Sequence, residues 1–201
     1  SKNAILNQLA ADLKTRQLLP ALMFTLSRKK CEVFAKTISI TLNTPEEQAL
    51  IIKLFDNHLR KSENYNSIIK MDQYFKLKDL IAKGVAFHHS GVYHIFKEVI
   101  EILFEKQLIK ILFCTETFAV GVNMPTKTAV FTGLTKYSDG GFRYLLSHEY
   151  KQMSGRSGRR GMDPVGTIIL LPNLYDLPTG TEMKNILSVK KSPSCIHFWW
   201  K

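Results

Sequence analysis

The alternation of short apolar segments with longer amphipathic ones is the feature that most restricts the fold of this chain. Each short segment is a brief, mostly apolar run, which is typical of a strand buried on both faces of a parallel sheet. The longer segments between them carry apolar residues at helical spacing. We therefore predict an α/β fold with one parallel sheet wrapped by helices through right-handed crossovers. The expected strands are residues 21–25, 85–87, 109–114, 128–132 and 165–171.

A helical insertion is expected between the first two strands, over about residues 42–83. Its first helix begins with the signals of a capping box, in which Thr44 caps the helix and Glu47 reaches back to it. A second helical stretch over residues 68–83 runs into Gly84, which suits a helix end. The insertion offers no catalytic residue of its own. After residue 172 the pattern weakens, so we predict a domain over 1–172 and a C-terminal extension over 173–201.

The charge balance of the chain indicates a polyanionic partner. Lys and Arg number 28 against 17 Asp and Glu, which gives a formal net charge of +11. Such an excess favours nucleic acid or another polyanion as a partner, without deciding between them. No apolar run approaches the roughly 18 residues that span a bilayer, so we expect no membrane association. The three cysteines are far apart and odd in number, so we expect neither a disulfide framework nor a cysteine metal site, and we expect an intracellular location.

Polar residues follow several of the expected strands, at the edge where ligands collect in α/β folds. Ser27 and Arg28 follow the first strand, and Arg28 suits either a phosphate contact or a solvated helix start. His88 and His89 end the second strand, but neighbouring residues point to opposite sides of a strand, so a metal site is not expected. The amide of Gly91 at the next helix start can instead meet a phosphate, with a histidine alongside.

The segment after the third strand adds further candidates. Thr115 stands directly after this strand and could contact a phosphate. Asn123 could hydrogen-bond a ribose, or it could only make the turn before Pro125.

Residues 152–161 contain two Gly-Arg pairs three residues apart. On a helix, Arg156 and Arg159 would project from nearly the same face, with Gln152 one turn earlier. Two planar guanidinium groups on one face suit a polyphosphate, which is the pattern of an arginine finger. The glycines, among them Gly155, remove bulk where another surface must come close. The alternative is a Gly/Arg-rich surface loop, or a basic patch that binds any polyanion. After a polar loop that contains Asp139-Gly140-Gly141, we expect the helix that opens near residue 147 to carry the arginine pair.

Taken together, four segments resemble the second RecA-like domain of superfamily 2 DExH-box RNA helicases, and most closely the superkiller-type helicases that serve the RNA exosome. The order and the gaps match, and the resemblance covers roughly residues 1–190. The segments are 22–28, 88–91, 115–125 and 152–161.

This resemblance implies a role for each candidate residue. Gln152, Arg156 and Arg159 would face ATP held by a preceding RecA-like domain, where the arginines stabilise charge on the transferring phosphoryl group. Gly121, Asn123 and Gly155 would approach the same nucleotide.

The remaining candidates would hold the backbone of single-stranded RNA with little sequence specificity. They are Ser27, Arg28, His89, Gly91 and Thr115. Since both ligands are expected at loops on one sheet edge, ATP-driven closure of two domains would change the grip on RNA.

The sequence contains neither G-x-x-x-x-G-K-[ST] nor D-E-x-H. The resemblance therefore places the phosphate-binding loop and the Mg²⁺-binding acid in a preceding domain, so this fragment should have little ATPase by itself. Residues 187–200 resemble the lead-in to a winged-helix region. The implied partners are RNA, the preceding domain, and the RNA exosome or its adaptors. The alternative is a non-catalytic nucleic-acid-binding or protein-docking module that kept the fold.

Overall fold

The computed structural model describes residues 1–188 and 194–199, and in them the main sheet has six strands, all paired in parallel. The strand order is β2-β3-β1-β4-β7-β8. All of the expected strands are present, which confirms the predicted α/β fold. The strands are β1 (Ala21–Phe24), β2 (Val85–His88), β3 (Ile111–Cys114), β4 (Thr128–Phe131), β7 (Gly166–Leu170) and β8 (Ser194–Phe198).

The centre of the sheet is formed by β1, which pairs with β3 on one side and β4 on the other. Leu22 of β1 lies opposite Leu112 and Ala129 in these two pairs. Every residue of β1, β2, β3 and β4 is buried. Burial on both faces explains why these segments read as continuous apolar runs instead of alternating ones.

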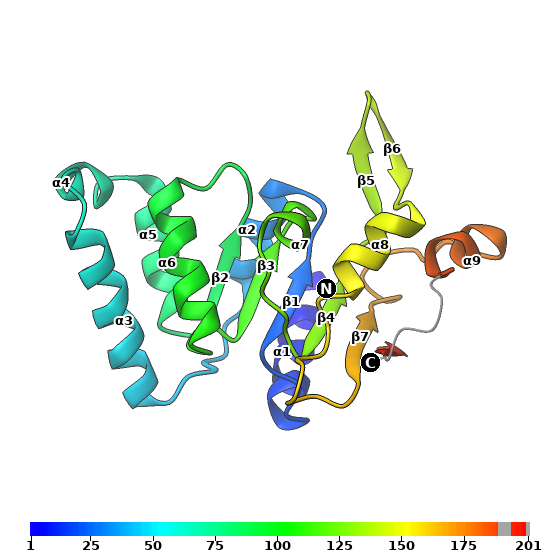
Figure 1. Ribbon diagram of the computed structural model, residues 1–201, viewed down its shortest axis with the longest axis horizontal. Coiled ribbons are helices and arrows are strands. Elements are labelled where there is room, and N and C mark those ends of the chain that lie inside the picture. The colour runs from blue at the N-terminus through cyan, green and yellow to red at the C-terminus, as the bar shows by residue number, and fades with distance from the viewer. Residues whose placement is uncertain (189–193, 200–201) are drawn as a thin grey trace.

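Helices flank the sheet, and Figure 1 shows α3 to α6 gathered on the side of β2, with α8 and then α9 on the opposite side of the molecule. The apolar face of α6 illustrates how the sequence selects these helices, since Phe96, Val99, Ile100 and Leu103 are all buried and recur at helical spacing. The helices outside the insertion are α1 (Lys2–Thr15), α2 (Arg28–Thr37), α6 (His94–Glu105), α7 (Thr117–Gly121), α8 (Ser147–Ser154) and α9 (Thr181–Leu187).

The expected helical insertion is present as α3 (Pro45–Arg60), α4 (Tyr65–Ile68) and α5 (Asp72–Ile81). The capping box at its start is confirmed: the amide of Glu47 donates to Thr44 Oγ1 at 3.2 Å, and the amide of Thr44 donates to Glu47 Oε1 at 3.1 Å. Gly84 ends the insertion with a φ of +84°, which favours glycine.

A β-hairpin, β5 (Thr135–Ser138) and β6 (Gly141–Tyr144), replaces the polar loop expected before α8. Its turn is Asp139-Gly140, and both residues have positive φ, at 51° and 84°. An Asp-Gly pair with two positive φ angles is the favoured two-residue hairpin turn, so the loop expectation missed a readable signal. The hairpin stands away from the sheet at the top of Figure 1.

The segment after residue 172 is more ordered than its sequence pattern suggests. It forms α9 and then β8, which extends the main sheet beside β7. Trp199 is buried, and its Nε1 donates to Asp12 Oδ2 of α1 at 2.9 Å. The boundary at 172 and the lead-in to a further region stay predictions, and residues 189–193 and 200–201 of that tail lie outside the described residues.

Candidate functional site

Ser27 and Arg28 lie directly after β1, at the carboxyl edge of the sheet. Ser27 is the N-cap of α2, and its hydroxyl accepts from the amide of Lys30 at 3.3 Å. Arg28 is exposed in the first turn. A β-carbon added at Gly91 would lie 3.9 Å from Arg28 Cδ, so the loops after β1 and β2 are neighbours. The structure therefore brings these three predicted RNA residues to one place.

His89 joins the same group through two hydrogen bonds. Its Nδ1 accepts from the amide of Gly91 at 3.0 Å, so the proton is on Nε2, which donates to Glu32 Oε1 at 3.1 Å. Lys76 Nζ pairs with the other oxygen of Glu32 at 3.0 Å. Burial opposes ionisation of Glu32, but the hydrogen bonds from Lys76 and His89 outweigh it and lower the pKa of the carboxyl. His89 is thus a buried, oriented side chain that holds the Gly91 loop. The expectation that the Gly91 amide is open to a phosphate at a helix start is wrong, because that amide is bonded to His89 and α6 begins only at His94.

Thr115 lies after β3 but does not offer its hydroxyl to solvent. The residue is 6% exposed, and its Oγ1 lies 2.9 Å from Thr117 Oγ1. Its amide donates to His88 O at 3.3 Å. Any phosphate contact at Thr115 would therefore need this short turn to move.

A cleft of about 550 Å³ separates α7 from α8 below the hairpin. Gly121 and Gln152, both predicted to face the nucleotide, line it together. Apart from Gly121 itself, its chain neighbours and the backbone of its own helix, no heavy atom lies within 4 Å of the position that a β-carbon there would occupy, so the backbone is open to a ligand. The other lining residues are Glu116, Thr117, Val120, Lys136, His148, Glu149 and Met153.

Arg156 links the two segments that were predicted to approach the nucleotide. Its Nη1 donates to Asn123 Oδ1 at 2.9 Å, its Nε donates to the carbonyl oxygen of Ala119 at 2.9 Å, and Nη2 donates to the same oxygen. All three guanidinium nitrogens are therefore engaged with the α7 segment. Asn123 does more than make a turn before Pro125, because its side chain accepts this bond.

Arg159 is held differently, by a carboxylate four residues later. Its Nε donates to Asp163 Oδ2 at 2.7 Å and its Nη2 donates to Asp163 Oδ1 at 3.2 Å. The hydrogen bond from Arg159 lowers the pKa of the Asp163 carboxyl, against the smaller opposing effect of burial. The side chains are 15% and 6% exposed, respectively, which makes this a largely buried pair.

The expectation that α8 carries both arginines is wrong. The helix ends at Ser154 with Gly155 as its C-cap, so only Gln152 is helical. Arg156 and Arg159 lie in the following segment, residues 155–165, which we call the arginine loop. Gly158 and Gly161 have positive φ, at +87° and +78°, and such backbone cannot continue a right-handed helix.

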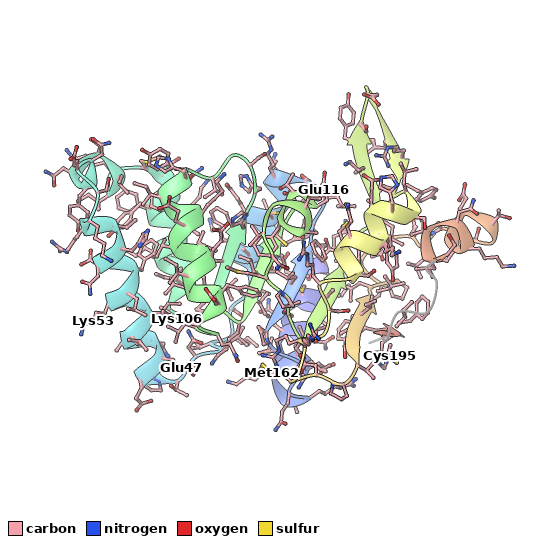
Figure 2. The ribbon with its side chains drawn as sticks, viewed as in Figure 1. Glu47, Lys53, Lys106, Glu116, Met162 and Cys195 are labelled. Atoms are coloured by element: carbon pink, nitrogen blue, oxygen red, sulfur yellow. The ribbon has the colours of Figure 1, made fainter. Side chains whose placement is uncertain are left out.

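The arginine loop runs to the amino edge of the sheet. Ser157 forms an isolated parallel bridge with Thr126, which precedes β4, and the loop then enters β7 at Gly166. Figure 2 places Glu116 near the upper end of the sheet and Met162 of the arginine loop near the lower end. The expectation that nucleotide and RNA residues share one sheet edge is therefore wrong for the arginine loop.

Close backbone packing holds this loop against β7. A β-carbon at Gly166 would lie 2.5 Å from the carbonyl oxygen of Ser157, and one at Gly158 would lie 3.1 Å from Gly166 Cα. Only glycine permits such an approach, so these two glycines serve packing within the chain.

An ion-pair network beside the cleft was missed at the sequence level. Lys136 of β5 bridges Glu116 at 3.0 Å and Glu149 at 3.1 Å, and Arg143 of β6 donates to Glu149 at 2.7 and 3.2 Å. Glu149 Oε1 also accepts from the amide of Leu146 at 2.9 Å. Burial disfavours ionisation of Glu149, but the bonds from Arg143, the Leu146 amide and Lys136 outweigh it and lower its pKa to about 2.

This network fixes the base of the hairpin to α8 and to the loop before α7. The charges of its members were readable in the sequence, but nothing in their spacing joined them before the hairpin was known. The same holds for Asp163, although its position four residues after Arg159 was a signal that could have been used.

The part of the chain that the structure describes holds neither a metal centre nor a membrane span. In residues 1–188 and 194–199, no group of three or more His, Cys, Asp or Glu side chains could hold a metal ion. His88 Nε2 lies 3.0 Å from Glu101 Oε1, and burial lowers the pKa of this histidine despite that partner. Over the same residues, no helix combines the length and apolar character needed to cross a bilayer.

Comparison with known proteins gives a consistent match. The family model described as the helicase conserved C-terminal domain matches residues 2–161. The chain is 42% identical over 175 residues to Superkiller complex protein 2 of Homo sapiens, covering 84% of this chain and 14% of that protein. It is 41% identical over 165 residues to Exosome RNA helicase MTR4 of Homo sapiens, covering 82% and 16%.

A yeast helicase is similar to this chain to nearly the same degree as these two human proteins. The chain is 39% identical over 160 residues to Antiviral helicase SKI2 of Saccharomyces cerevisiae, covering 79% of this chain and 12% of that protein. The chain therefore spans less than a fifth of the length of these relatives. The parallel sheet, the match over residues 2–161 and these identities show that the chain belongs to the helicase conserved C-terminal domain family, with superkiller-type helicases among its relatives.

Proposed function

We propose that this chain is the C-terminal half of the motor of an ATP-dependent RNA helicase. A preceding RecA-like domain would bind ATP and Mg²⁺, and this chain would complete the nucleotide site from the other side. The observation that carries the proposal is the convergence of two separate segments. Arg156 bonds to Ala119 and Asn123, and Gly121 lines the same cleft as Gln152.

The nucleotide-facing roles follow from the chemistry of these groups. Bound ATP supplies the phosphoryl group that is transferred to water. Arg159 would place a guanidinium beside the negative charge that develops during transfer, where a preorganised donor is most effective. Gln152 would contribute an amide from the cleft wall. Gly121 and Gly155 would let the nucleotide approach the backbone, and Asn123 would position it together with Arg156.

The fit of Arg159 to a phosphate can be tested on its own contacts. Within residues 1–188 and 194–199, its Nη1 has no hydrogen-bond partner, whereas Nε and Nη2 are both bonded to Asp163. A guanidinium held along one edge keeps donors on the other edge for an anion. The residues present therefore suit a phosphate ligand at this position.

The RNA-facing role is proposed for Ser27, Arg28, His89, Gly91 and Thr115. The first four meet at the carboxyl edge of β1 and β2, where Arg28 is exposed beside Gly91. His89 would act by holding the Gly91 loop, because both of its ring nitrogens are already engaged. Contacts to phosphates and not to base edges would make binding insensitive to sequence and sensitive to salt.

Coupling between the two ligands is proposed to run through the segment from Thr115 to Asn123. This segment begins at the RNA edge and ends at the bond to Arg156. If the two domains close on ATP and Arg156 moves, the segment from Thr115 to Asn123 would move with it. This segment also reaches the sheet edge where RNA is proposed to bind, so the RNA contacts would change as well. Hydrolysis would reverse the displacement and release the grip.

The wider setting is proposed from the relatives. One of them is named an exosome RNA helicase and another a superkiller complex protein. We therefore propose the RNA exosome or its adaptors as partners and an intracellular location. The net charge of +11 is in keeping with an RNA ligand.

A non-catalytic RNA-binding or docking module is the competing function. Such a module has no need of a guanidinium held with donors to spare, so the contacts of Arg159 favour the motor.

The test uses the complete protein and the substitution Arg159→Ala. We expect RNA-stimulated ATP turnover to fall by about 10³-fold, the scale of losing an arginine finger, with RNA affinity nearly unchanged. Arg160→Ala is the matched control, because Arg160 is the exposed neighbour. Turnover in Arg159→Ala equal to that of the control would refute the finger assignment and favour the binding module.

A further inference from the structure

The contacts of Arg159 with Asp163 fix both its backbone and its side chain. Besides the two side-chain bonds, the amide of Arg159 donates to Asp163 Oδ2 at 3.0 Å. The amides of Met162 and Asp163 in turn donate to the carbonyl oxygen of Arg159 at 3.0 and 2.9 Å. One turn of chain, closed around Gly161 at a φ of +78°, therefore sets where the guanidinium lies.

The two arginines of the loop are not equivalent in their contacts. Arg156 has all three guanidinium nitrogens bonded to Ala119 or Asn123. Arg159 is bonded along its Nε and Nη2 edge only, and in the described part of the chain its Nη1 is unengaged. Of the two, Arg159 is the one whose present geometry leaves donors available to an incoming anion.

We infer that Asp163 is a positioning residue for Arg159, and that it presents the guanidinium to the phosphate side of the nucleotide site. The inference rests on the proposed function, since it presumes that Arg159 meets a nucleotide. It adds a residue that lies outside the four segments of the resemblance. It also separates the roles of the pair: Arg156 ties the arginine loop to the α7 segment, and Arg159 is the oriented finger.

The physical reason lies in the freedom of an arginine side chain. An unheld arginine samples many rotamers, and ordering it at the moment of reaction weakens its effect on the rate. A buried carboxylate that takes Nε and Nη2 selects one orientation before the ligand arrives. The pairing is strong because the side chain of Asp163 is only 6% exposed and makes a bidentate contact.

Two other roles for Asp163 make different predictions. If Asp163 only stabilised the turn, its loss would lower the melting temperature and leave turnover unchanged in the folded protein. If Asp163 restrained Arg159 in a resting position, its loss would raise turnover. Positioning predicts a lower kcat with little change in the KM for ATP, because the oriented guanidinium acts mainly on the transition state.

The experiment measures RNA-stimulated ATP turnover of the complete protein carrying Asp163→Asn. We expect kcat to fall by roughly 10- to 100-fold with KM changed less than about twofold, as for other small misplacements of a catalytic group. In an Arg159→Ala background, Asp163→Asn should cause no further fall, because its effect passes through Arg159. The matched control is Asp56→Asn, which removes the carboxylate from another Asp–Arg pair four residues apart, with Arg60 on α3.

Each result of these measurements either supports or overturns the positioning role of Asp163. A raised or unchanged kcat in Asp163→Asn, with Arg159→Ala strongly impaired, overturns the positioning role and leaves the proposed function intact. Full turnover in Arg159→Ala overturns both. An additive fall in the double variant also overturns positioning through Arg159. If Asp163→Asn does not fold, Asp163→Glu keeps the carboxylate, and positioning then predicts a kcat between those of the wild type and Arg159→Ala.

Discussion

Glu149 offers the sharpest stability test, because one carboxylate joins the hairpin to α8. In Glu149→Gln, the amide keeps one acceptor oxygen but turns a donor towards Arg143 or Lys136. A pKa lowered from 4.5 to about 2 corresponds to roughly 3 kcal/mol of stabilisation at neutral pH. Arg143 is 35% exposed, so solvent screening reduces the expected loss to about 2 kcal/mol.

The assay is urea unfolding of this chain at pH 7 and again at pH 3. Because the pKa of Glu149 is lowered by folding, its contribution is present above the ordinary value of 4.5 and is lost as pH falls towards about 2. The difference in unfolding free energy between wild type and variant should therefore shrink at pH 3. Glu46→Gln is the control, since Glu46 is an exposed glutamate in the first turn of α3.

A loss at pH 7 no larger than that of Glu46→Gln would contradict this reasoning. A difference of equal size at both pH values would also contradict it, because the effect would then not come from the ionised carboxylate.

Two further predictions concern packing and RNA. Gly166→Ala would place a β-carbon 2.5 Å from a backbone oxygen of the arginine loop, so we expect the free energy of unfolding, measured by thermal unfolding, to fall by about 2–4 kcal/mol. The control is Gly133→Ala, whose β-carbon would meet no neighbouring segment within 4 Å and which should be nearly neutral. Equal effects of the two substitutions would refute the packing argument. Arg28→Ala in the complete protein should weaken single-stranded RNA binding and reduce the slope of log affinity against log salt by about one. Lys53→Ala on α3 is the control and should change neither quantity. A weaker affinity with an unchanged slope would count against a phosphate contact at Arg28.

Much of the fold was readable because local sequence and global packing agree. The strands from β1 to β4 are buried on both faces, so their sequences are continuous apolar runs bounded by polar turns. The capping box at Thr44 and the glycine at 84 marked the ends of the insertion for equally local reasons. Such features need no knowledge of distant contacts.

What the sequence pattern missed depends on contacts between distant segments. β8 is an edge strand that holds its place through β7 and through the bond of Trp199 to Asp12, and neither partner is near it in sequence. The end of α8 was misplaced because Gln152 and the arginines have helical spacing, whereas the bridge of Ser157 to Thr126 draws the chain out of the helix. The hairpin is the exception, since its Asp-Gly turn was a local signal that went unused.

The candidate site was also predictable only in part from the sequence. Residue types and their order identified the segments that converge, but not how each side chain is held. Thr115 is buried against Thr117, and Arg156 is bonded on all three nitrogens, and neither fact follows from a motif. Asp163 and Glu149 gain their roles only once the arginine loop and the hairpin are in place.

The most direct test of the proposed function is a structure of the complete protein bound to a non-hydrolysable ATP analogue and single-stranded RNA. The proposed function predicts that Arg159 lies within hydrogen-bond distance of the terminal phosphate, while Asp163 still holds its Nε edge. It also predicts RNA phosphates beside Arg28 and the Gly91 loop. A nucleotide bound away from both the arginine loop and the cleft of Gly121 and Gln152 would contradict it.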